Sequence, residues 1–298
     1  MRDLLIESNY WASEVDAELV NREHIDKAIQ EQQARVSRLE NINQEAILRG
    51  QTIIYTSGEQ IGQINALTVA NLGKFTYGQP SRISAVTRIG DGKVIDIEQE
   101  ADLSGNIHTK GILIMNHYFS AHYLPEKNLS FSGSIVFEQS YGEIDGDSAS
   151  TAEMLTLISS LSEVPIKQNI AITGAIDQNG NIQAIGGVNE KIEGFYSICN
   201  KRGLDGSQGV VIPLSNKPNL MLRKDVLEAV EAGKFSIYAI SHLDEAIEIM
   251  TGQAAGKRNE DGYFPENTVN ALVESKLEYY AELHHQQEKD DDKDDDDE

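Results

Sequence analysis

Two residues whose side chains can act together in nucleophilic catalysis stand out in the sequence, Ser148 and Lys191. Ser148 lies in Gly146-Asp147-Ser148-Ala149-Ser150, and Lys191 follows 43 positions later in Gly186-Gly187-Val188-Asn189-Glu190-Lys191-Ile192. A serine hydroxyl is a weak nucleophile until a base removes its proton, and a neutral lysine amine is able to be that base. No residue pattern of a His-based triad or of a metal site competes with this pair in the sequence.

The surroundings of Ser148 suit a nucleophile at the start of a helix. Small residues follow it, and we expect a helix over 147–162. The free N–H groups and the dipole of a first helical turn favour negative charge, as an oxyanion requires. The same run, taken alone, is also typical of an ordinary helix cap.

The surroundings of Lys191 favour a neutral amine. The residue follows the apolar, glycine-rich stretch 185–188 and falls in the first turn of a helix expected over 189–202. Burial and the positive end of a helix both lower a lysine pKa. A solvated lysine here would place a cation at the unfavourable end of the dipole, a local conflict typical of functional sites.

Helices and strands must position these two residues. The order in which we expect them along the sequence predicts an α+β domain with an antiparallel first part and an α/β second part, preceded by a helical segment. Residues 1–50 read as helical, with a long helix capped by Asn21 and closed by Gly50. Strands are expected at 52–55, 61–69, 134–138, 209–212 and 235–240, hairpins at 82–98 (turn 90–92) and 170–184 (turn 179–180), and helices at 108–123, 147–162, 189–202, 224–232, 243–250 and 268–282.

Composition limits the partners. The 298-residue chain carries a net charge of −23, of which the run 289–298 holds −6. An acidic body argues against nucleic-acid binding, which needs clustered Lys and Arg. Cys199, the only cysteine, excludes an internal disulfide and is expected in the core. No apolar run is long enough to cross a membrane, and we expect a cytoplasmic protein.

The chain resembles the proteolytic domain of the Lon ATP-dependent proteases, specifically their B-type branch, over about residues 50–252. The motifs that carry the resemblance are Gly62-Gln63-Ile64-Asn65, Pro80-Ser81-Arg82-Ile83, Leu103-Ser104-Gly105, His108-Thr109-Lys110-Gly111 and the runs around Ser148 and Lys191. The resemblance implies a serine peptidase that acts on unfolded polypeptides, with Ser148 as nucleophile and Lys191 as general base.

It also implies roles for three further residues. Thr173 stands where the family has a threonine that helps hold the amine, although the residue alone reads as part of a strand. Asp145 and Asp147 match acidic residues that contribute in the B-type branch, and their plain reading is a loop and a helix cap. Details of the A-type enzymes do not transfer, because Asp147 replaces their proline and 134–138 lacks their histidines.

An ATPase module is not evident in the sequence. No Gly-x-x-x-x-Gly-Lys-Ser/Thr motif occurs, and Gly256-Lys257-Arg258 is not one. We therefore predict a helical segment at 1–50 that links to a missing ATPase module, a proteolytic domain at 51–252, a helical extension at 253–287 and a disordered acidic tail at 288–298. We expect no cofactor in this chain, and we expect ATP and magnesium only in the missing module.

Two kinds of function remain open at this point. The chain is either a Ser–Lys endopeptidase normally coupled to an ATP-dependent unfoldase, or a non-catalytic or latent Lon-like assembly domain that needs its ATPase ring. Non-catalytic domains of this type characteristically lack the serine or the lysine, and this chain keeps both. The resemblance also implies a homo-oligomer, a hexameric ring in the full-length protein, with no nucleic-acid or membrane partner.

Overall fold

The computed structural model describes residues 1–71, 73, 75–90, 92–124 and 130–295, without the side chains of residues 33 and 288–295. The chain divides into two compact units, one of residues 1–52 and 71–77, the other of residues 53–70 and 78–298. None of the described helices is long and apolar enough to cross a membrane.

The first unit is built from three helices, α1 (Arg2–Ser13), α2 (Arg22–Val36) and α3 (Arg38–Leu48). Asn21 caps α2 as predicted, because its Oδ1 accepts the backbone N–H of His24 at 3.2 Å. The single helix predicted to end at Gly50 is divided at Ser37 into α2 and α3. The ion pair of Glu7 with Arg35 joins α1 to α2.

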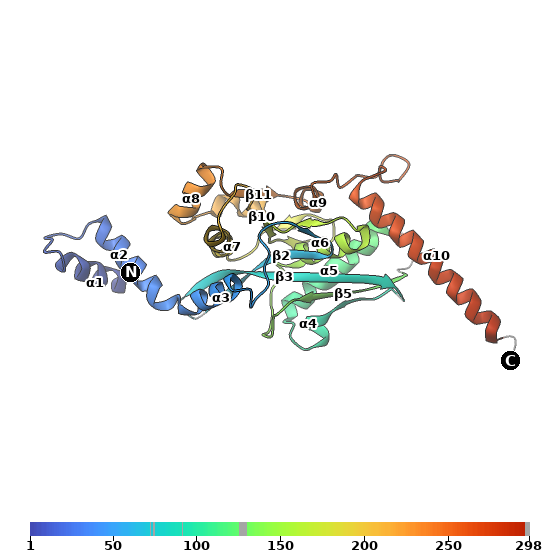
Figure 1. Ribbon diagram of the computed structural model, residues 1–298, viewed down its shortest axis with the longest axis horizontal. Coiled ribbons are helices and arrows are strands. Elements are labelled where there is room, and N and C mark those ends of the chain that lie inside the picture. The colour runs from blue at the N-terminus through green and yellow to red at the C-terminus, as the bar shows by residue number, and fades with distance from the viewer. Residues whose placement is uncertain (72, 74, 91, 125–129, 296–298) are drawn as a thin grey trace. The chain divides into compact units, whose positions relative to one another are not determined.

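The second unit is built around a seven-stranded mixed sheet in the order β11-β10-β7-β2-β3-β5-β4. The pairs β11–β10, β10–β7 and β7–β2 are parallel, β3–β5 is antiparallel and β5–β4 is parallel. Figure 1 shows β3 running between β2 and β5. The bounds are β2 (Gln63–Asn71), β3 (Thr76–Ile89), β4 (Val94–Asp96), β5 (Phe131–Phe137), β7 (Ile170–Ile172), β10 (Gly209–Pro213) and β11 (Ser236–Ile240).

The remaining described elements are two short two-stranded sheets and the helices that pack beside the main sheet. The small sheets pair β1 (Glu59–Gln60) with β6 (Ile166–Lys167) and β8 (Ala175–Ile176) with β9 (Ile182–Gln183). The helices are α4 (Ile97–Glu100), α5 (Asn106–Tyr123), α6 (Ser150–Ser162), α7 (Val188–Arg202), the 3₁₀ helix η1 (Leu214–Asn219), α8 (Lys224–Glu231), α9 (Leu243–Thr251) and α10 (Val269–Asp295). The α+β class predicted from the sequence is therefore confirmed.

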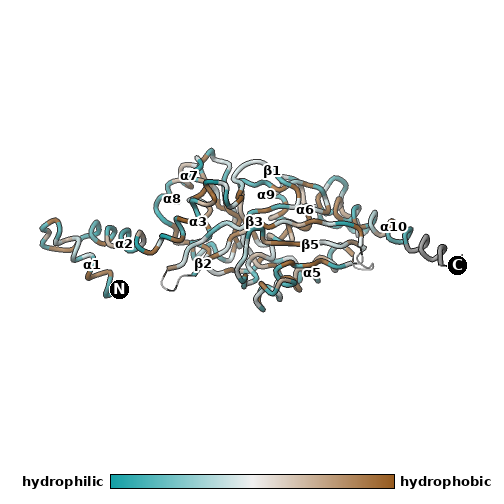
Figure 2. Tube along the Cα trace, turned by 60° about the horizontal axis from the view of Figure 1, so that its bottom comes forward, coloured by the Kyte–Doolittle hydropathy of each residue, from teal (hydrophilic) through white to brown (hydrophobic). Residues whose placement is uncertain are grey.

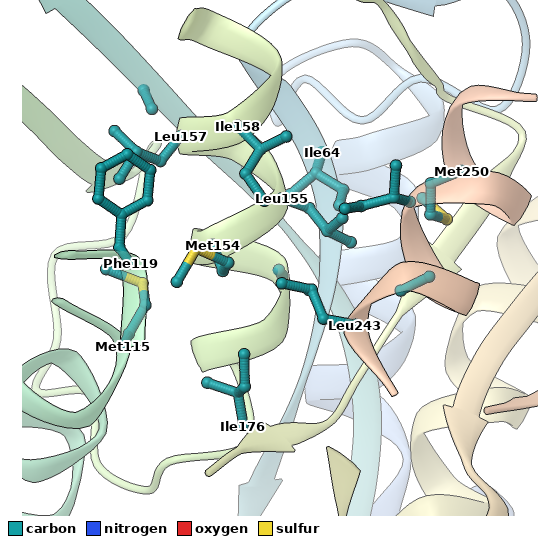
Figure 3. Close-up of a cluster of buried hydrophobic side chains, with 14 of the residues drawn as sticks. Ile64, Met115, Phe119, Met154, Leu155, Leu157, Ile158, Ile176, Leu243 and Met250 are labelled. Carbon is teal, nitrogen blue, oxygen red and sulfur yellow. The ribbon is translucent and has the colours of Figure 1, made fainter. Parts of the chain in front are cut away.

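Helix α6 forms the centre of the larger core. All of its residues except Ser160 are buried, as expected for a helix with neighbours on every side. In Figure 3, Met154 and Leu157 lie toward α5, and Leu155 and Ile158 lie toward Ile64 and the α9 side. Figure 2 shows apolar residues, in brown, at β5. Since Ser148 lies just before α6, the loop that carries it is anchored to a helix that is buried almost throughout.

Three predictions about strands are wrong. The segment 52–55 forms no strand, because side chains bind its backbone instead: Gln139 accepts the N–H of Ile53, and Arg202 donates to the carbonyl of Ile54. Residues 82–98 form no hairpin, because β5 lies between β3 and β4. Strand β5 carries the buried residues Phe131, Ile135 and Phe137, which favour a position inside the sheet rather than at its edge. Asp91 of the expected turn lies outside the described residues.

The third correction concerns residues 170–176, which form two strands rather than one. Thr173 and Gly174 separate β7 from β8 because their backbone groups bind elsewhere: Thr173 N–H donates to Val211 O at 3.1 Å, and Gly174 N–H donates to Ser148 O at 2.9 Å.

The helix predicted at 268–282 lies within α10, but the predicted acidic tail differs from expectation. Helix α10 packs Val269, Val273 and Leu277 into the same core as α6. It continues through Asp295, so residues 288–295 are helical where the sequence indicates disorder. Once packing has nucleated a helix, each further residue is added at little cost. Residues 296–298 of the predicted tail lie outside the described residues.

Candidate active site

Ser148 lies in a turn immediately before α6. The helix begins at Ser150 with Ala149 as its N-cap, and no side chain caps it, so the Ser148 hydroxyl is not used as a helix cap. The preceding Gly146 has φ +102°, a left-handed conformation that favours glycine and turns the chain into this position. The Ser148 carbonyl accepts the N–H of Gly174 at 2.9 Å.

Lys191 lies in the first turn of α7, as predicted. The helix begins at Val188, directly after Gly187, which has φ +67°. The Gly187 carbonyl accepts the N–H of Lys191 at 3.0 Å, and this hydrogen bond fixes the start of the turn. The apolar Ile185, Val188 and Ile192 around it are buried. The Lys191 side chain is consequently 2% exposed.

The structure brings Ser148, Lys191 and Thr173 together. Lys191 Nζ donates to Ser148 Oγ at 2.8 Å and to Thr173 Oγ1 at 3.0 Å. Thr173 Oγ1 in turn donates to the carbonyl oxygen of Ser148 at 3.2 Å. A single hydroxyl therefore fixes both the amine and the backbone of the serine.

The electrostatics favour a neutral amine at moderately alkaline pH. Burial lowers the pKa of Lys191 from 10.5 to about 8, and the nearby Asp147 carboxylate opposes that shift. A lysine in this state is able to accept a proton from a serine hydroxyl 2.8 Å away.

Asp147 and Asp145 take different places. Asp147 is half-buried beside Ser148, and its carbonyl accepts both the N–H of Ser150 at 3.1 Å and the Ser150 hydroxyl at 2.8 Å. Asp145 points to the start of α5, where its Oδ1 accepts the N–H groups of Ile107 at 3.0 Å and His108 at 3.3 Å. Hydrogen bonds from Gly146 and these N–H groups lower the pKa of Asp145. Asp145 is thus a helix cap that holds the serine loop.

Sequence reasoning missed residues that support the pair without touching it. Gly111 of α5 packs on Asp147: a Cβ added there would lie 3.2 Å from Asp147 Cβ. Gly174, between β7 and β8, binds the Ser148 carbonyl and also accepts the N–H of Thr151 at 3.2 Å. Glycine next to a strand residue was the available signal for such a close approach. Cys199 lies in the core as predicted, and burial raises the pKa of its thiol to about 12.

No group of three or more His, Cys, Asp or Glu residues in the described part of the chain is arranged to hold a metal ion. Since the carboxylates nearest to Ser148 either cap α5 or lie beside the amine, the chemistry that the described side chains can supply there is proton transfer to and from a serine nucleophile.

Two segments of the chain are similar to known protein families. Residues 139–252 match the Lon protease (S16) C-terminal proteolytic domain, and residues 1–35 match the AAA+ ATPase LID domain of archaeal LonB. The latter segment, read from the sequence as a link to an ATPase module, is thus similar to a part of such a module.

Individual relatives give the same result. A protein named "Putative Lon protease homolog" from Escherichia coli (strain K12) is 46% identical over 241 residues, 80% of this chain and 41% of that protein. Its counterpart in Haemophilus influenzae is 44% identical over 79% of this chain and 40% of that protein. An archaeal Lon protease from Methanocaldococcus jannaschii is 38% identical over 43% of this chain and 18% of that protein.

The chain spans about two fifths of the length of the first two relatives. Within that span it contains the proteolytic domain, preceded by a segment similar to the LonB LID domain. Residues 139–252 of the chain therefore form a Lon protease (S16) C-terminal proteolytic domain, and the chain is homologous to the putative Lon protease homologs.

Proposed function

We propose that this chain is a serine endopeptidase with a Ser148–Lys191 dyad that hydrolyses unfolded polypeptides. The observation that supports the proposal most directly is the 2.8 Å contact of Lys191 Nζ with Ser148 Oγ, made by a buried amine with a lowered pKa. An amine within hydrogen-bond reach of the nucleophile is the geometry that general-base catalysis requires.

The reaction follows from these contacts. The neutral Lys191 amine takes the Ser148 proton while Oγ attacks the peptide carbonyl carbon, which forms a tetrahedral oxyanion. The Lys191 ammonium then protonates the departing amine, and an acyl-enzyme remains on Ser148. Attack by water, with Lys191 again as base, releases the second product and restores Ser148.

Backbone groups beside Ser148 suit the oxyanion. Within the described residues, the N–H groups of Ser148 and Ala149 make no backbone hydrogen bond, and they stand at the positive end of α6. Such preorganised donors stabilise the developing negative charge in the transition state. Thr173 keeps the amine aimed at Oγ rather than at Asp147.

The proposal extends to the full-length protein. There the peptidase is coupled to an ATPase module that binds ATP and magnesium, and the subunits form a homo-oligomeric, hexameric ring in the cytoplasm. The similarity of residues 1–35 to an AAA+ LID domain supports the coupling. A ring that encloses Ser148 admits only threaded chains, which is a physical reason for a preference for unfolded substrates.

The Ser148→Ala variant tests the dyad. We expect hydrolysis of a fluorescently labelled, unfolded polypeptide to fall by at least about 10³-fold, because the nucleophile is gone. The lost hydroxyl also removes a hydrogen bond of the Lys191 amine, so we expect the free energy of unfolding to change by about 1–3 kcal/mol. Wild-type turnover in Ser148→Ala would refute the assignment.

A fluorophosphonate probe separates an active site from a latent or non-catalytic one. Such a probe reacts with activated serines, so we expect it to label wild-type protein and neither Ser148→Ala nor Lys191→Met. The dyad contact already formed in this chain favours the active alternative. A wild-type chain that stays unlabelled would favour the latent one.

A further inference from the structure

Four ionisable side chains are buried together in the larger core, apart from the dyad. They are Asp96 at the end of β4, Glu98 in α4, His108 in α5 and Glu153 in α6, each at most 4% exposed. His108 Nε2 lies 3.2 Å from Asp96 Oδ2 and 3.6 Å from Glu153 Oε1. The ring of His108 also meets Phe137 of β5 edge-on at 5.7 Å. A cluster of buried charges stabilises a protein less than apolar side chains of the same volume would. A contribution of this cluster other than stability is therefore expected.

The cluster is not a metal centre. These residues all belong to the described part of the chain, in which no group of His, Cys, Asp and Glu is placed to hold a metal ion. The cluster joins β4, α5 and α6, and two of these elements lead to Ser148.

One of these elements is the first turn of α5, which supports the loop before Ser148. The backbone N–H groups of Ile107 and His108 donate to Asp145 Oδ1, and Gly105 N–H donates to Ile144 O at 2.8 Å. One turn later, Gly111 leaves space for Asp147. Residues 144–147 thus rest on the turn that carries His108.

The other element is the first turn of α6, which follows Ser148 in the sequence. Glu153 belongs to this turn, and its N–H donates to Ala149 O at 3.0 Å. The side chain of His108 therefore links the first turn of α5 to the first turn of α6. The first turn of α5 supports the loop before Ser148, and the first turn of α6 follows Ser148. Asp96 adds the edge strand β4 as a third support.

We propose that His108 is a positioning residue, whose imidazolium, held between Asp96 and Glu153, fixes the first turns of α5 and α6 and so keeps Ser148 within reach of Lys191. This inference rests on the proposed peptidase function. His108 acts only through these elements and touches no reacting atom.

The charges facing His108 are consistent with this role. Burial alone would lower the pKa of His108, but Asp96, Glu153 and Glu98 together raise it to about 9. Burial raises the pKa of Glu153 to about 8 and that of Glu98 to about 7, so these two carboxyl groups keep part of their protons near neutral pH. The cluster then holds a stable cation beside Asp96, without three full negative charges in the core.

The test compares the same substitution at two places on α5. His108→Gln removes the cation, and His122→Gln, at the other end of the helix among Tyr118, Tyr123 and Phe264, is the matched control. We expect kcat per folded molecule to fall about 10- to 100-fold in His108→Gln, with KM within twofold, because a displacement near 1 Å has that effect on catalysis. In His122→Gln both parameters should stay within twofold.

A role in stability alone would lower the melting temperature without changing kcat of the folded protein. Folded His108→Gln with kcat within twofold of wild type overturns the inference. If His108→Gln does not fold, Asp96→Asn, which removes the negative charge 3.2 Å from His108 Nε2, takes its place with the same two outcomes.

A measurement on unmodified protein completes the test. In ¹⁵N-histidine-labelled wild-type protein, we expect both ring nitrogens of His108 to carry a proton at pH 7; a neutral ring overturns the inference whatever the variants do. Ser148→Ala is assayed in parallel. Full activity in that variant would refute the peptidase dyad itself, whereas an inactive Ser148→Ala beside a fully active His108→Gln would refute only the positioning role.

Discussion

At the scale of single residues, Thr173 shows how one hydroxyl group serves two partners in the site. Its hydroxyl accepts a hydrogen bond from Lys191 and gives its one proton to the Ser148 carbonyl. Both partners are held by the strand end at which Thr173 lies, and the residue is fully buried. Replacing it changes the aim of the amine without changing the dyad.

Thr173→Val is nearly isosteric and removes only the hydroxyl. We expect kcat to fall about 10-fold, because a hydrogen bond to a charged group contributes ~1.5–3 kcal/mol and only a part of it acts in the transition state. Thr173→Ser, which keeps the hydroxyl, is the control and should retain most activity. Equal kcat values for Thr173→Val and wild type in polypeptide hydrolysis would contradict the positioning of Lys191 by Thr173.

The lowered pKa of Lys191 sets the expected pH dependence. The base is neutral only above its pKa, so kcat should rise with pH through a midpoint near pH 8. Lys191→Arg should be inactive at every pH, because arginine stays protonated. Glu153 also titrates near pH 8, and Glu153→Gln is the control: the midpoint should remain in that variant. Activity in Lys191→Arg would show that the residue supplies only charge.

The same pKa predicts a gain in stability with pH. The unfolded chain holds the Lys191 proton up to pH 10.5, whereas the folded protein releases it near pH 8. The unfolded state therefore binds more protons between these values, and the free energy of unfolding rises with pH in that window. Relative to Lys191→Met, wild type should gain up to roughly 3 kcal/mol from pH 8 to 10.5 in urea denaturation. If the difference in the free energy of unfolding between wild type and Lys191→Met does not change with pH, the lowered pKa of Lys191 is contradicted.

At the scale of elements, α7 carries Lys191 and lies unusually close to β3. A Cβ on Gly194 of α7 would lie 2.1 Å from the carbonyl oxygen of Gly78, and a Cβ on Gly78 would lie 2.0 Å from Glu190 O. Two glycines therefore allow backbone-to-backbone contact, which sets how far Lys191 reaches toward Ser148.

Gly194→Ala should push α7 away from β3. We expect a loss of about 1–3 kcal/mol in the free energy of unfolding from overpacking, and a fall in kcat of the folded protein because the amine moves. Gly186→Ala is the matched control close to the same helix, since a Cβ there meets nothing within 4 Å. Thermal melts and polypeptide hydrolysis measure both effects; a silent Gly194→Ala would mean that the helix is not held by this contact.

The sequence allowed the helices and the proximity of Ser148 to Lys191 to be predicted better than the pairing of strands. Local signals such as the Asn21 cap and the apolar spacing in 108–123 identify helices, because their hydrogen bonds lie within the segment. Strand order depends on distant partners, so the turn residues around Gly90 predicted a hairpin that β5 interrupts.

The residues that support the site could not be predicted from the sequence, because they too depend on partners that are distant in the chain. Asp145 reads as an ordinary loop residue, and only the fold shows that it caps a helix 38 positions earlier. The cluster around His108 joins β4, α5 and α6, and no spacing in the sequence brings Asp96 next to Glu153. In contrast, local signals placed Ser148 and Lys191 each at the start of a helical segment, and the structure has Ser148 just before α6 and Lys191 in the first turn of α7.

At the scale of the whole molecule, negative charge is the dominant surface property. The net charge is −23, and residues 289–298 hold −6 of it at one end of the sequence. Like-charged subunits repel each other, and salt screens the repulsion over a Debye length of ~10 Å at 0.1 M. Assembly into the proposed ring therefore has to overcome an electrostatic barrier that depends on ionic strength.

We expect the chain to associate weakly at low salt and to form larger species as sodium chloride is raised from about 0.05 to 0.5 M, a range in which the Debye length shortens severalfold. Sedimentation velocity over a series of concentrations measures this. A chain that ends at residue 288 is the matched comparison, because it lacks the −6 of the run 289–298 and should associate at lower salt. If repulsion limits assembly, the two salt dependences are displaced from each other in that direction. A chain that remains monomeric at every salt concentration while it hydrolyses polypeptide at full rate would show that Ser148 and Lys191 need no ring to act.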